Sequence, residues 1–165
     1  MNLYDLHSNP EELHGFDIAP YKMPELAYEL AKKNPELRPK LEPVIIKDPE
    51  YALEYALYVL KRRWSEAEPY HLKDPKWAYM YAKYVLERRW PEAEPYIMKD
   101  PHYAYWYAKS ILKRRWPEAE PHIMKGVSPA FNYAAYILKR RWPEAEPYIM
   151  KDQFWWETYK VQFKL

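Results

Sequence analysis

The chain has 165 residues, of which 48% are apolar and 18% aromatic, so it can bury a core and does not resemble a disordered segment. Its net charge of +2 comes from 26 basic and 24 acidic residues, so the overall charge gives no sign of nucleic-acid binding. Cysteine is absent, which excludes disulfides and thiol catalysis.

The first residues carry neither a basic region nor an apolar run, so we predict no signal peptide, no membrane span and a cytoplasmic location. Residues 1–23 contain several prolines and do not fit the pattern that follows. We expect them to form a cap over one end of the fold.

A motif of Arg-Arg-Trp, one further residue and Glu-Ala-Glu-Pro recurs every 26 residues. Its tryptophans are Trp64, Trp90, Trp116 and Trp142. A fixed period of this length is typical of repeat proteins. The predicted divisions of this single domain are an N-terminal cap at 1–23, a degenerate repeat at 24–47, four full repeats across 48–151 and a C-terminal aromatic cap at 152–165.

Each full repeat is predicted to begin with a long helix. Asp48-Pro49 places an N-capping aspartate before a proline at the first helical position, and two further repeats begin in the same way. The fourth has Gly126-Val127-Ser128-Pro129, which predicts a later start with Ser128 as N-cap. The apolar stripe has helical spacing over about 14 residues and predicts an end near Arg-Arg-Trp. In the first repeat it comprises Ala52, Tyr55, Ala56, Val59 and Leu60.

A second, short helix should follow each tryptophan. Pro91 suits its first position, whereas Pro95 would interrupt it, so we expect this element to be short, kinked or partly 3₁₀. One long and one short helix per repeat predict an all-α fold, a right-handed solenoid capped at both ends. The tail over residues 154–165 fits the helical stripe but also alternates like a strand, and an exposed strand edge could recruit another chain.

Units of the form Tyr-Ala-x-x-Val/Ile-Leu-Lys-Arg-Arg-Trp-Pro-Glu-Ala-Glu-Pro-x-Ile resemble tandem α-helical repeats of uncharacterised bacteriophage and large-virus proteins. The resemblance covers roughly residues 24–158. It implies a helical-repeat fold and a viral origin, and it brings no functional residues with it.

The sequence offers no candidate catalytic, cofactor or metal site. Its few serines lie outside nucleophile motifs, and two glycines cannot build a phosphate-binding loop. The paired glutamates recur in every repeat, which favours a structural role. The five histidines, His7, His14, His71, His102 and His122, never take a ligand spacing, so surface or packing roles are favoured. We therefore expect a protein that is not an enzyme and needs no cofactor.

The arginine pairs could stack into two basic columns beside tryptophan, an arrangement that could read phosphates and bases. The Glu-Ala-Glu columns nearby supply the opposite charge, so internal Arg–Glu pairing is favoured. At 100° per residue along the helix, the second arginine of each pair falls on the same side as the buried apolar residues. An unpaired charge buried there would be costly. The alternative anion site would use the first arginines, Arg62, Arg88, Arg114 and Arg140.

The outer positions of the long helices differ between repeats, and repeat proteins commonly vary one face for recognition. Met80 and Trp106 are large apolar residues among otherwise polar ones, and tyrosines flank them. Tyr, Trp and Met are enriched at the centres of interfaces. The predicted partner-binding residues are Met80, Lys83, Tyr84, Trp106, Lys109 and Tyr136.

These patterns favour a non-catalytic repeat scaffold that binds a protein partner. The viral resemblance suggests a phage protein that inhibits or redirects a host factor in the host cytoplasm. One alternative is nucleic-acid or nucleotide binding along the arginine columns, and a second is a structural, self-assembling protein. The sequence leaves the partner and the oligomeric state open.

Overall fold

The structure is a computed structural model that describes residues 23–165, and no strand occurs between them. The all-α prediction is therefore confirmed for this part of the chain, while the predicted N-terminal cap at 1–23 lies, except for Met23, outside the described residues. The longer helices are α1 (Pro24–Lys33), α3 (Pro49–Glu54), α5 (Pro75–Tyr84), α7 (Pro101–Tyr107), α9 (Val127–Tyr133) and α11 (Gln153–Phe163). Their π-helical extensions are η5 (Tyr55–Leu60), η7 (Ala108–Leu112) and η9 (Ala134–Leu138).

The shorter helices alternate with these in the chain. They are α2 (Arg38–Ile45), α4 (Glu68–Leu72), α6 (Glu94–Ile97), α8 (Glu120–Ile123) and α10 (Glu146–Ile149). Three 3₁₀ turns lead into some of them: η4 (Pro35–Leu37), η6 (Ser65–Ala67) and η8 (Pro117–Ala119). The second element is short and partly 3₁₀, as predicted, but the roles expected of its prolines were wrong. The helix α6 begins at Glu94 and not at Pro91, so Pro95 lies in the first turn, where it interrupts nothing because no helical hydrogen bond is lost.

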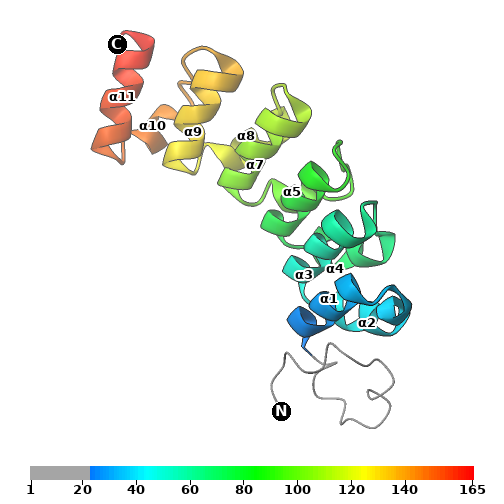
Figure 1. The fold of residues 1–165 in the computed structure, drawn as a ribbon. Coiled ribbons are helices and arrows are strands. Elements are labelled where there is room, and N and C mark those ends of the chain that lie inside the picture. The colour runs from blue at the N-terminus through cyan, green and yellow to red at the C-terminus, as the bar shows by residue number, and fades with distance from the viewer. Residues whose placement is uncertain (1–22) are drawn as a thin grey trace.

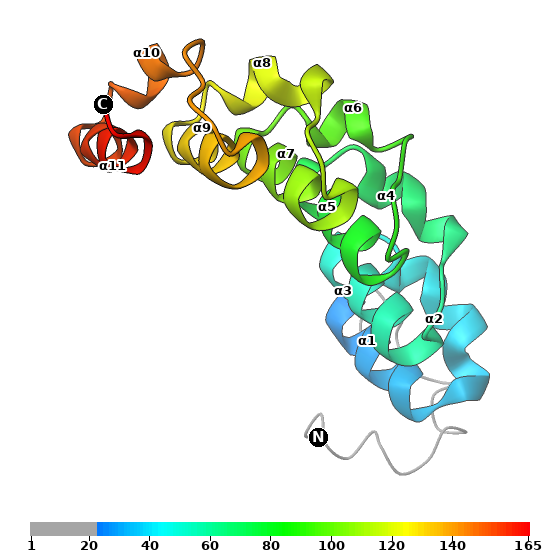
Figure 2. The ribbon, with the colours of Figure 1, turned by 90° about the horizontal axis from the view of Figure 1, so that it is seen from above.

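The helices form two parallel rows that follow an arc (Figures 1 and 2). The long helices, from α1 to α11, lie side by side on the inner side of the arc, and the short helices lie on the outer side (Figure 2). Each long helix packs against the next one, as α5 does against α7 and α7 against α9. The short helices pack against the long helices on either side, as α6 does against α5 and α7.

Aspartate caps fix where most of the long helices begin. The carboxylate of Asp100 accepts hydrogen bonds from the backbone N–H groups of His102 (2.8 Å) and Tyr103 (3.1 Å). Asp48 and Asp74 accept the same pair of hydrogen bonds at the starts of α3 and α5. Such caps satisfy donors that a helix leaves free and typically contribute about 1 kcal/mol each.

The fourth long helix does not begin where the sequence predicted. Gly126, not Ser128, is its N-cap, and α9 begins at Val127, in line with the other starts. Pro129 falls in the first turn, where its missing N–H costs nothing. A side chain at residue 126 would bring a Cβ to 2.8 Å from the Cβ of Pro101, so glycine fits where the earlier repeats have aspartate.

The long helices also end earlier than predicted. The helix that begins as α3 stops at Leu60, four residues before Trp64, and Lys61 takes the left-handed conformation with φ of 51°. The Ala56 carbonyl then accepts the N–H groups of both Lys61 and Arg62. The same left-handed conformation recurs at Glu87, Lys113, Lys139 and Lys164. Without glycine, each such turn costs on the order of 1 kcal/mol.

The core lies between the two rows of helices. Each long helix from α3 to α9 contributes two fully buried alanines and a fully buried tyrosine, such as Ala104, Ala108 and Tyr107. The small alanines let neighbouring helices approach closely. A buried tryptophan from the following loop packs on each tyrosine, and the ring centres of Tyr107 and Trp116 lie 5.2 Å apart.

The C-terminal segment is helical. Residues 153–163 form α11, so the alternative prediction of a strand with a free edge is wrong. On α9, Phe131 packs against Trp155 of α11, as Tyr79 packs against Tyr103 one repeat earlier. The residue of α11 in register with Phe131 is the exposed Glu157, which forms an ion pair with Lys160. The last helix thus ends the row with a polar face.

His71 is the buried histidine of the core, and it packs on Tyr81. Its Nδ1 lies 2.8 Å from the Ala67 carbonyl and its Nε2 lies 2.8 Å from the Pro49 carbonyl. Burial lowers the pKa of His71 below its ordinary value of 6.5, and the two carbonyls oppose that effect in part. The corresponding residues in the later repeats are isoleucines.

We expect the His71→Ile variant to lose part of the acid sensitivity of the protein. Because the pKa of His71 is lowered in the folded state, the unfolded chain takes up a proton first as the pH falls below about 6.5. The wild type should therefore lose stability as the pH falls through that window. Urea unfolding at about pH 7.5 and about pH 5 measures the loss, which should be smaller in the variant. Equal losses in the two proteins would contradict the assignment.

Candidate functional site

A buried tyrosine hydroxyl joins each long helix to the loop of the preceding repeat. The backbone N–H of Trp90 donates to the Tyr107 hydroxyl (2.7 Å), which donates to Glu94 Oε1 (3.2 Å). Tyr133 and Tyr159 make the same two hydrogen bonds one and two repeats later. Burial raises the pKa of these hydroxyls, so they stay protonated and able to donate.

The junction made by Tyr81 differs in one contact. The Tyr81 hydroxyl accepts from the Trp64 N–H (2.8 Å) but donates to the Trp64 carbonyl (3.0 Å) instead of to Glu68. Burial raises the pKa of Tyr81 to about 12. In these four copies the hydroxyl holds a backbone group of the tryptophan, so it fixes the position of the loop relative to the next helix. The Tyr55 hydroxyl, one repeat length before Tyr81, instead donates to Glu42 of α2 (2.9 Å).

The second arginine of each pair binds a glutamate in the same loop. Arg89 donates from Nε (2.6 Å) and Nη2 (2.7 Å) to the two carboxylate oxygens of Glu94. Arg63–Glu68, Arg115–Glu120 and Arg141–Glu146 repeat this bidentate pair. The favoured Arg–Glu pairing is thus confirmed for these four arginines. Hydrogen bonds from Arg115 hold the pKa of Glu120 below its ordinary value of 4.5.

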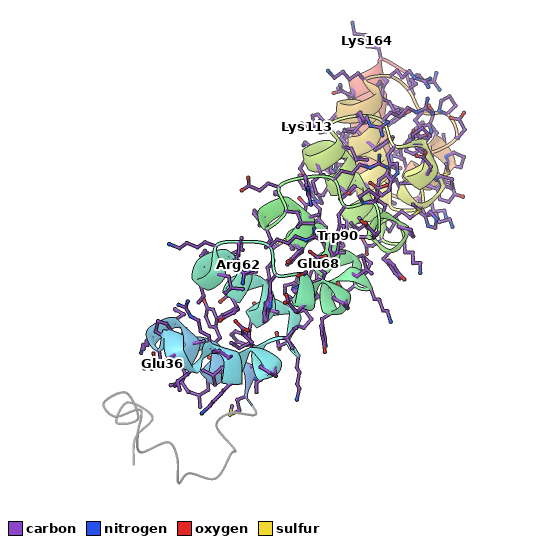
Figure 3. All side chains as sticks on the ribbon, turned by 90° about the vertical axis from the view of Figure 1, so that its right-hand side faces the viewer. Glu36, Arg62, Glu68, Trp90, Lys113 and Lys164 are labelled. Carbon is purple, nitrogen blue, oxygen red and sulfur yellow. The ribbon has the colours of Figure 1, made fainter. Side chains whose placement is uncertain are left out.

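The helical periodicity predicted that the arginine of this pair is buried, whereas the structure buries the glutamate. The Arg89 side chain is 51% exposed, whereas that of Glu94 is only 9% exposed. The reason is that the long helix ends before the arginine, so its 100° periodicity no longer places that side chain. Glu68 and Trp90 lie between the two rows, as Figure 3 shows, and the arginine covers the glutamate from the solvent side.

The first arginines remain exposed. Arg62, Arg88, Arg114 and Arg140 form no ion pair with any residue in 23–165, and Arg62 lies on the loop edge in Figure 3. The exposed glutamates that follow each tryptophan, Glu66, Glu92, Glu118 and Glu144, lie in the same loops. Within the described residues, the predicted anion site therefore keeps one unpaired arginine in each full repeat, whereas each second arginine is neutralised by its glutamate.

Lysine and aromatic side chains meet on the inner side of the long helices. Lys109 Nζ lies 5.1 Å from the ring centre of Trp106 and 4.6 Å from that of Tyr136, which belongs to η9. One repeat earlier, Lys83 Nζ lies 4.8 Å from the ring centre of Tyr84. Trp106 is 44% exposed and Tyr136 is 56% exposed. The structure thus brings Lys109, Trp106 and Tyr136 into one cluster.

We call the six residues of the sequence prediction, Met80, Lys83, Tyr84, Trp106, Lys109 and Tyr136, the aromatic–lysine face. They belong to α5, α7 and the π-helical extensions η7 and η9, which pack in sequence along the inner row. Met80 is half-buried against the core, Lys83 is also half-buried, and the other four are exposed. The Tyr79 hydroxyl lies 3.3 Å from Ser110 Oγ and links α5 to η7 beneath the face.

The sequence prediction missed the continuation of this face on α11. Phe154 is 69% exposed, Val161 is 80% exposed and Leu165 is also exposed. Phe154 and Val161 follow Ser128 and Ala135 by one repeat length, which places them on the same side of the helix, and Leu165 lies just beyond its end. The 26-residue spacing could have identified these exposed residues, but the sequence of the tail also fits the alternating pattern of a strand.

A hollow of about 370 Å³ lies beside the aromatic–lysine face, between the ends of η5 and α5. Tyr84, Lys61, Arg62 and Glu87 line it together with apolar residues. No group of three potential metal-ligating side chains occurs within residues 23–165. None of the helices over the same range has the length and apolar character needed to cross a membrane.

A comparison of the chain with known protein families, curated proteins and solved structures finds no match.

Proposed function

We propose that the chain is a non-catalytic repeat scaffold that binds a protein partner on the inner side of its long helices. The observation that supports this most directly is the exposed cluster of Trp106, Lys109 and Tyr136, which spans two neighbouring long helices. A few residues contribute most of the binding energy at protein interfaces, and Trp and Tyr are enriched among them. An inner surface that crosses several helices can contact an elongated segment of a partner.

The scaffold in this proposal is a right-handed solenoid of 26-residue units, divided as the sequence predicts. The starts of α3, α5, α7, α9 and α11 recur at that spacing, which supports the division. Each unit meets the next through a tyrosine hydroxyl, as Tyr107 does with Trp90. The resemblance to viral repeat proteins suggests a bacterial host protein as the partner, met in the host cytoplasm.

The two alternatives have less support. Nucleic-acid binding along the arginine columns would have to rely on the first arginines alone, because each second arginine is held by a glutamate. Self-assembly by stacking on α11 would place Glu157 and Lys160 at a contact where the earlier helices have aromatic residues. Burying that charged pair would disfavour the stack.

Retention experiments with a bacterial lysate test the proposal. We expect Trp106→Ala to lose the proteins that the immobilised wild type retains. A matched control is Tyr70→Ala, because Tyr70 is 50% exposed on the short helix α4 at the outer side of the arc. The control variant should retain the same proteins as the wild type. Equal retention by all three proteins would contradict the assignment of the binding face.

A further inference from the structure

The charges on the inner side of the long helices change from one end of the row to the other. The outward positions of the first full repeat carry two acidic residues, Glu50 and Glu54, and one lysine, Lys61. The next three repeats carry five lysines there and a single acidic residue, Glu87. The lysines are Lys76, Lys83, Lys109, Lys113 and Lys139. The last helix has the exposed apolar residues Phe154 and Val161 at these positions, with Thr158 between them.

The two central lysines are held by aromatic rings and not by carboxylates. Neither Lys83 nor Lys109 forms an ion pair with any residue in the described range 23–165. Their ammonium groups lie over tyrosine and tryptophan rings instead. A cation–π contact restrains a lysine but leaves its charge and its N–H donors available. Both side chains are therefore ordered in advance for an anionic ligand, which lowers the entropy lost on binding.

The hollow beside Tyr84 extends the cationic zone along the same side. Lys61 and Arg62 line it from the end of η5, and Glu87 is its acidic residue. Arg62 donates a hydrogen bond to the Arg63 carbonyl at 3.4 Å, so its guanidinium still has free donors. An acidic side chain that enters the hollow would meet two cations and the wall formed by Tyr84.

We propose that the inner side binds an acidic, extended segment of a protein, with carboxylates on Lys83 and Lys109 and apolar side chains on Phe154 and Val161. This proposal rests on the proposed function and specifies the chemistry of the partner. It also fixes how the segment is oriented along the row of helices, because its acidic part lies over α5 and α7 and its apolar part lies over α11.

The spacing of the helices suggests how the carboxylates are arranged. Packed helices lie about 8–10 Å apart. A polyproline II segment has three residues per turn and rises about 3.1 Å per residue, so side chains three residues apart project from one side about 9 Å apart. Acidic residues at every third position would therefore place one carboxylate over each long helix.

A nucleic acid fits this surface less well than a protein. A nucleic-acid backbone carries charge along its whole length, whereas the cationic residues of this surface do not continue to Phe154 and Val161 of α11. The apolar residues of α11 would face phosphates at one end, and Glu50 and Glu54 would repel them at the other.

Selection from a library of displayed random peptides tests the proposal, with the full chain as bait. We expect peptides with acidic residues followed or preceded by apolar ones, whose retention is lost in Trp106→Ala. A labelled member of the selected set is then titrated by fluorescence anisotropy against a Lys83→Met, Lys109→Met variant. Its affinity should fall by about tenfold, and the loss should shrink at high salt.

A matched control is Lys99→Met, Lys151→Met. These lysines also lie 5.0 Å from tyrosine ring centres, but they follow the short helices α6 and α10 at the outer side of the arc. This variant should bind the peptide with less than about a twofold change.

Three results would overturn the proposal. Selected peptides that depend on Trp106 but carry no acidic residues would leave the proposed function standing and refute the acidic partner. A single-stranded oligonucleotide that binds more tightly than the peptides and depends on Lys83 and Lys109 would show a nucleic-acid surface instead. A selection that yields no Trp106-dependent peptide would count against both the proposed function and this inference.

Discussion

Replacing Tyr107 by phenylalanine is expected to lower the free energy of unfolding by about 2–3 kcal/mol. The change removes one oxygen atom and leaves the ring in place against Trp116. It leaves the buried N–H of Trp90 without an acceptor and removes one hydrogen bond to the carboxylate of Glu94. An unpaired buried donor retains its full desolvation cost, which is larger than the net value of an ordinary hydrogen bond.

Urea unfolding followed by circular dichroism measures this effect, and Tyr105→Phe provides the control. Tyr105 is also buried on α7, but its hydroxyl makes no hydrogen bond to any residue in 23–165. The control should change the free energy of unfolding by less than about 0.5 kcal/mol. Equal effects of the two substitutions would show that the Tyr107 hydroxyl does not hold the junction between repeats.

Replacing Arg115 by methionine is expected to destabilise the protein by about 2–3 kcal/mol. The methionine keeps much of the side-chain volume but leaves the nearly buried carboxylate of Glu120 with only the Tyr133 hydroxyl as a partner. Loss of a partner from a fully buried pair costs about 3–5 kcal/mol. The smaller value reflects the half-exposed position of Arg115, which allows water to replace part of the interaction.

The complementary substitution Glu120→Gln should cost only about 1 kcal/mol, because Arg115 then faces solvent and glutamine still accepts from Tyr133. The pH dependence gives a second check. Arg115 lowers the pKa of Glu120 in the folded state, so this stabilisation is present above about 4.5 and is lost as the pH falls further. The difference between the wild type and Arg115→Met should therefore shrink in acid. A constant difference down to about pH 3 would contradict the assignment.

The regular features of the fold could be predicted because the same residues recur at the same positions in several repeats. The Asp-Pro pairs mark the starts of α3, α5 and α7, and capping by Asp48, Asp74 and Asp100 follows from their chemistry. The pairing of arginine with glutamate followed from balanced charges in one short loop. In each case a local rule and the long-range packing require the same structure.

The predictions that failed involve positions where a local rule was extended too far. The helical angle placed Arg89 in the core, but the helix has already ended in the left-handed turn at Glu87. No glycine marks that turn, so its sequence carries no signal for it. Ser128 is a good N-cap by type, yet the neighbouring Pro101 makes Gly126 the residue that fits at the start of α9. Both outcomes depend on contacts with other elements.

The candidate site was partly predictable because exposure follows from helical geometry. The outward positions of Trp106 and Lys109 follow from a period of 3.6 residues. The contact of Lys109 with Tyr136 could not be predicted, because it depends on how far apart two neighbouring helices lie. The apolar residues of α11 were missed because a short alternating segment fits two periods equally well.

The ¹H–¹⁵N NMR spectrum of the full chain, recorded with and without a selected acidic peptide, tests the binding face most directly. The inner row should bind the peptide, so the largest shift changes should fall on α5, α7, η9 and α11, including the indole N–H of Trp106. The short helices α4, α6, α8 and α10 should change little. Shift changes concentrated on those short helices, with the Trp106 signal unmoved, would contradict binding on the inner side of the arc.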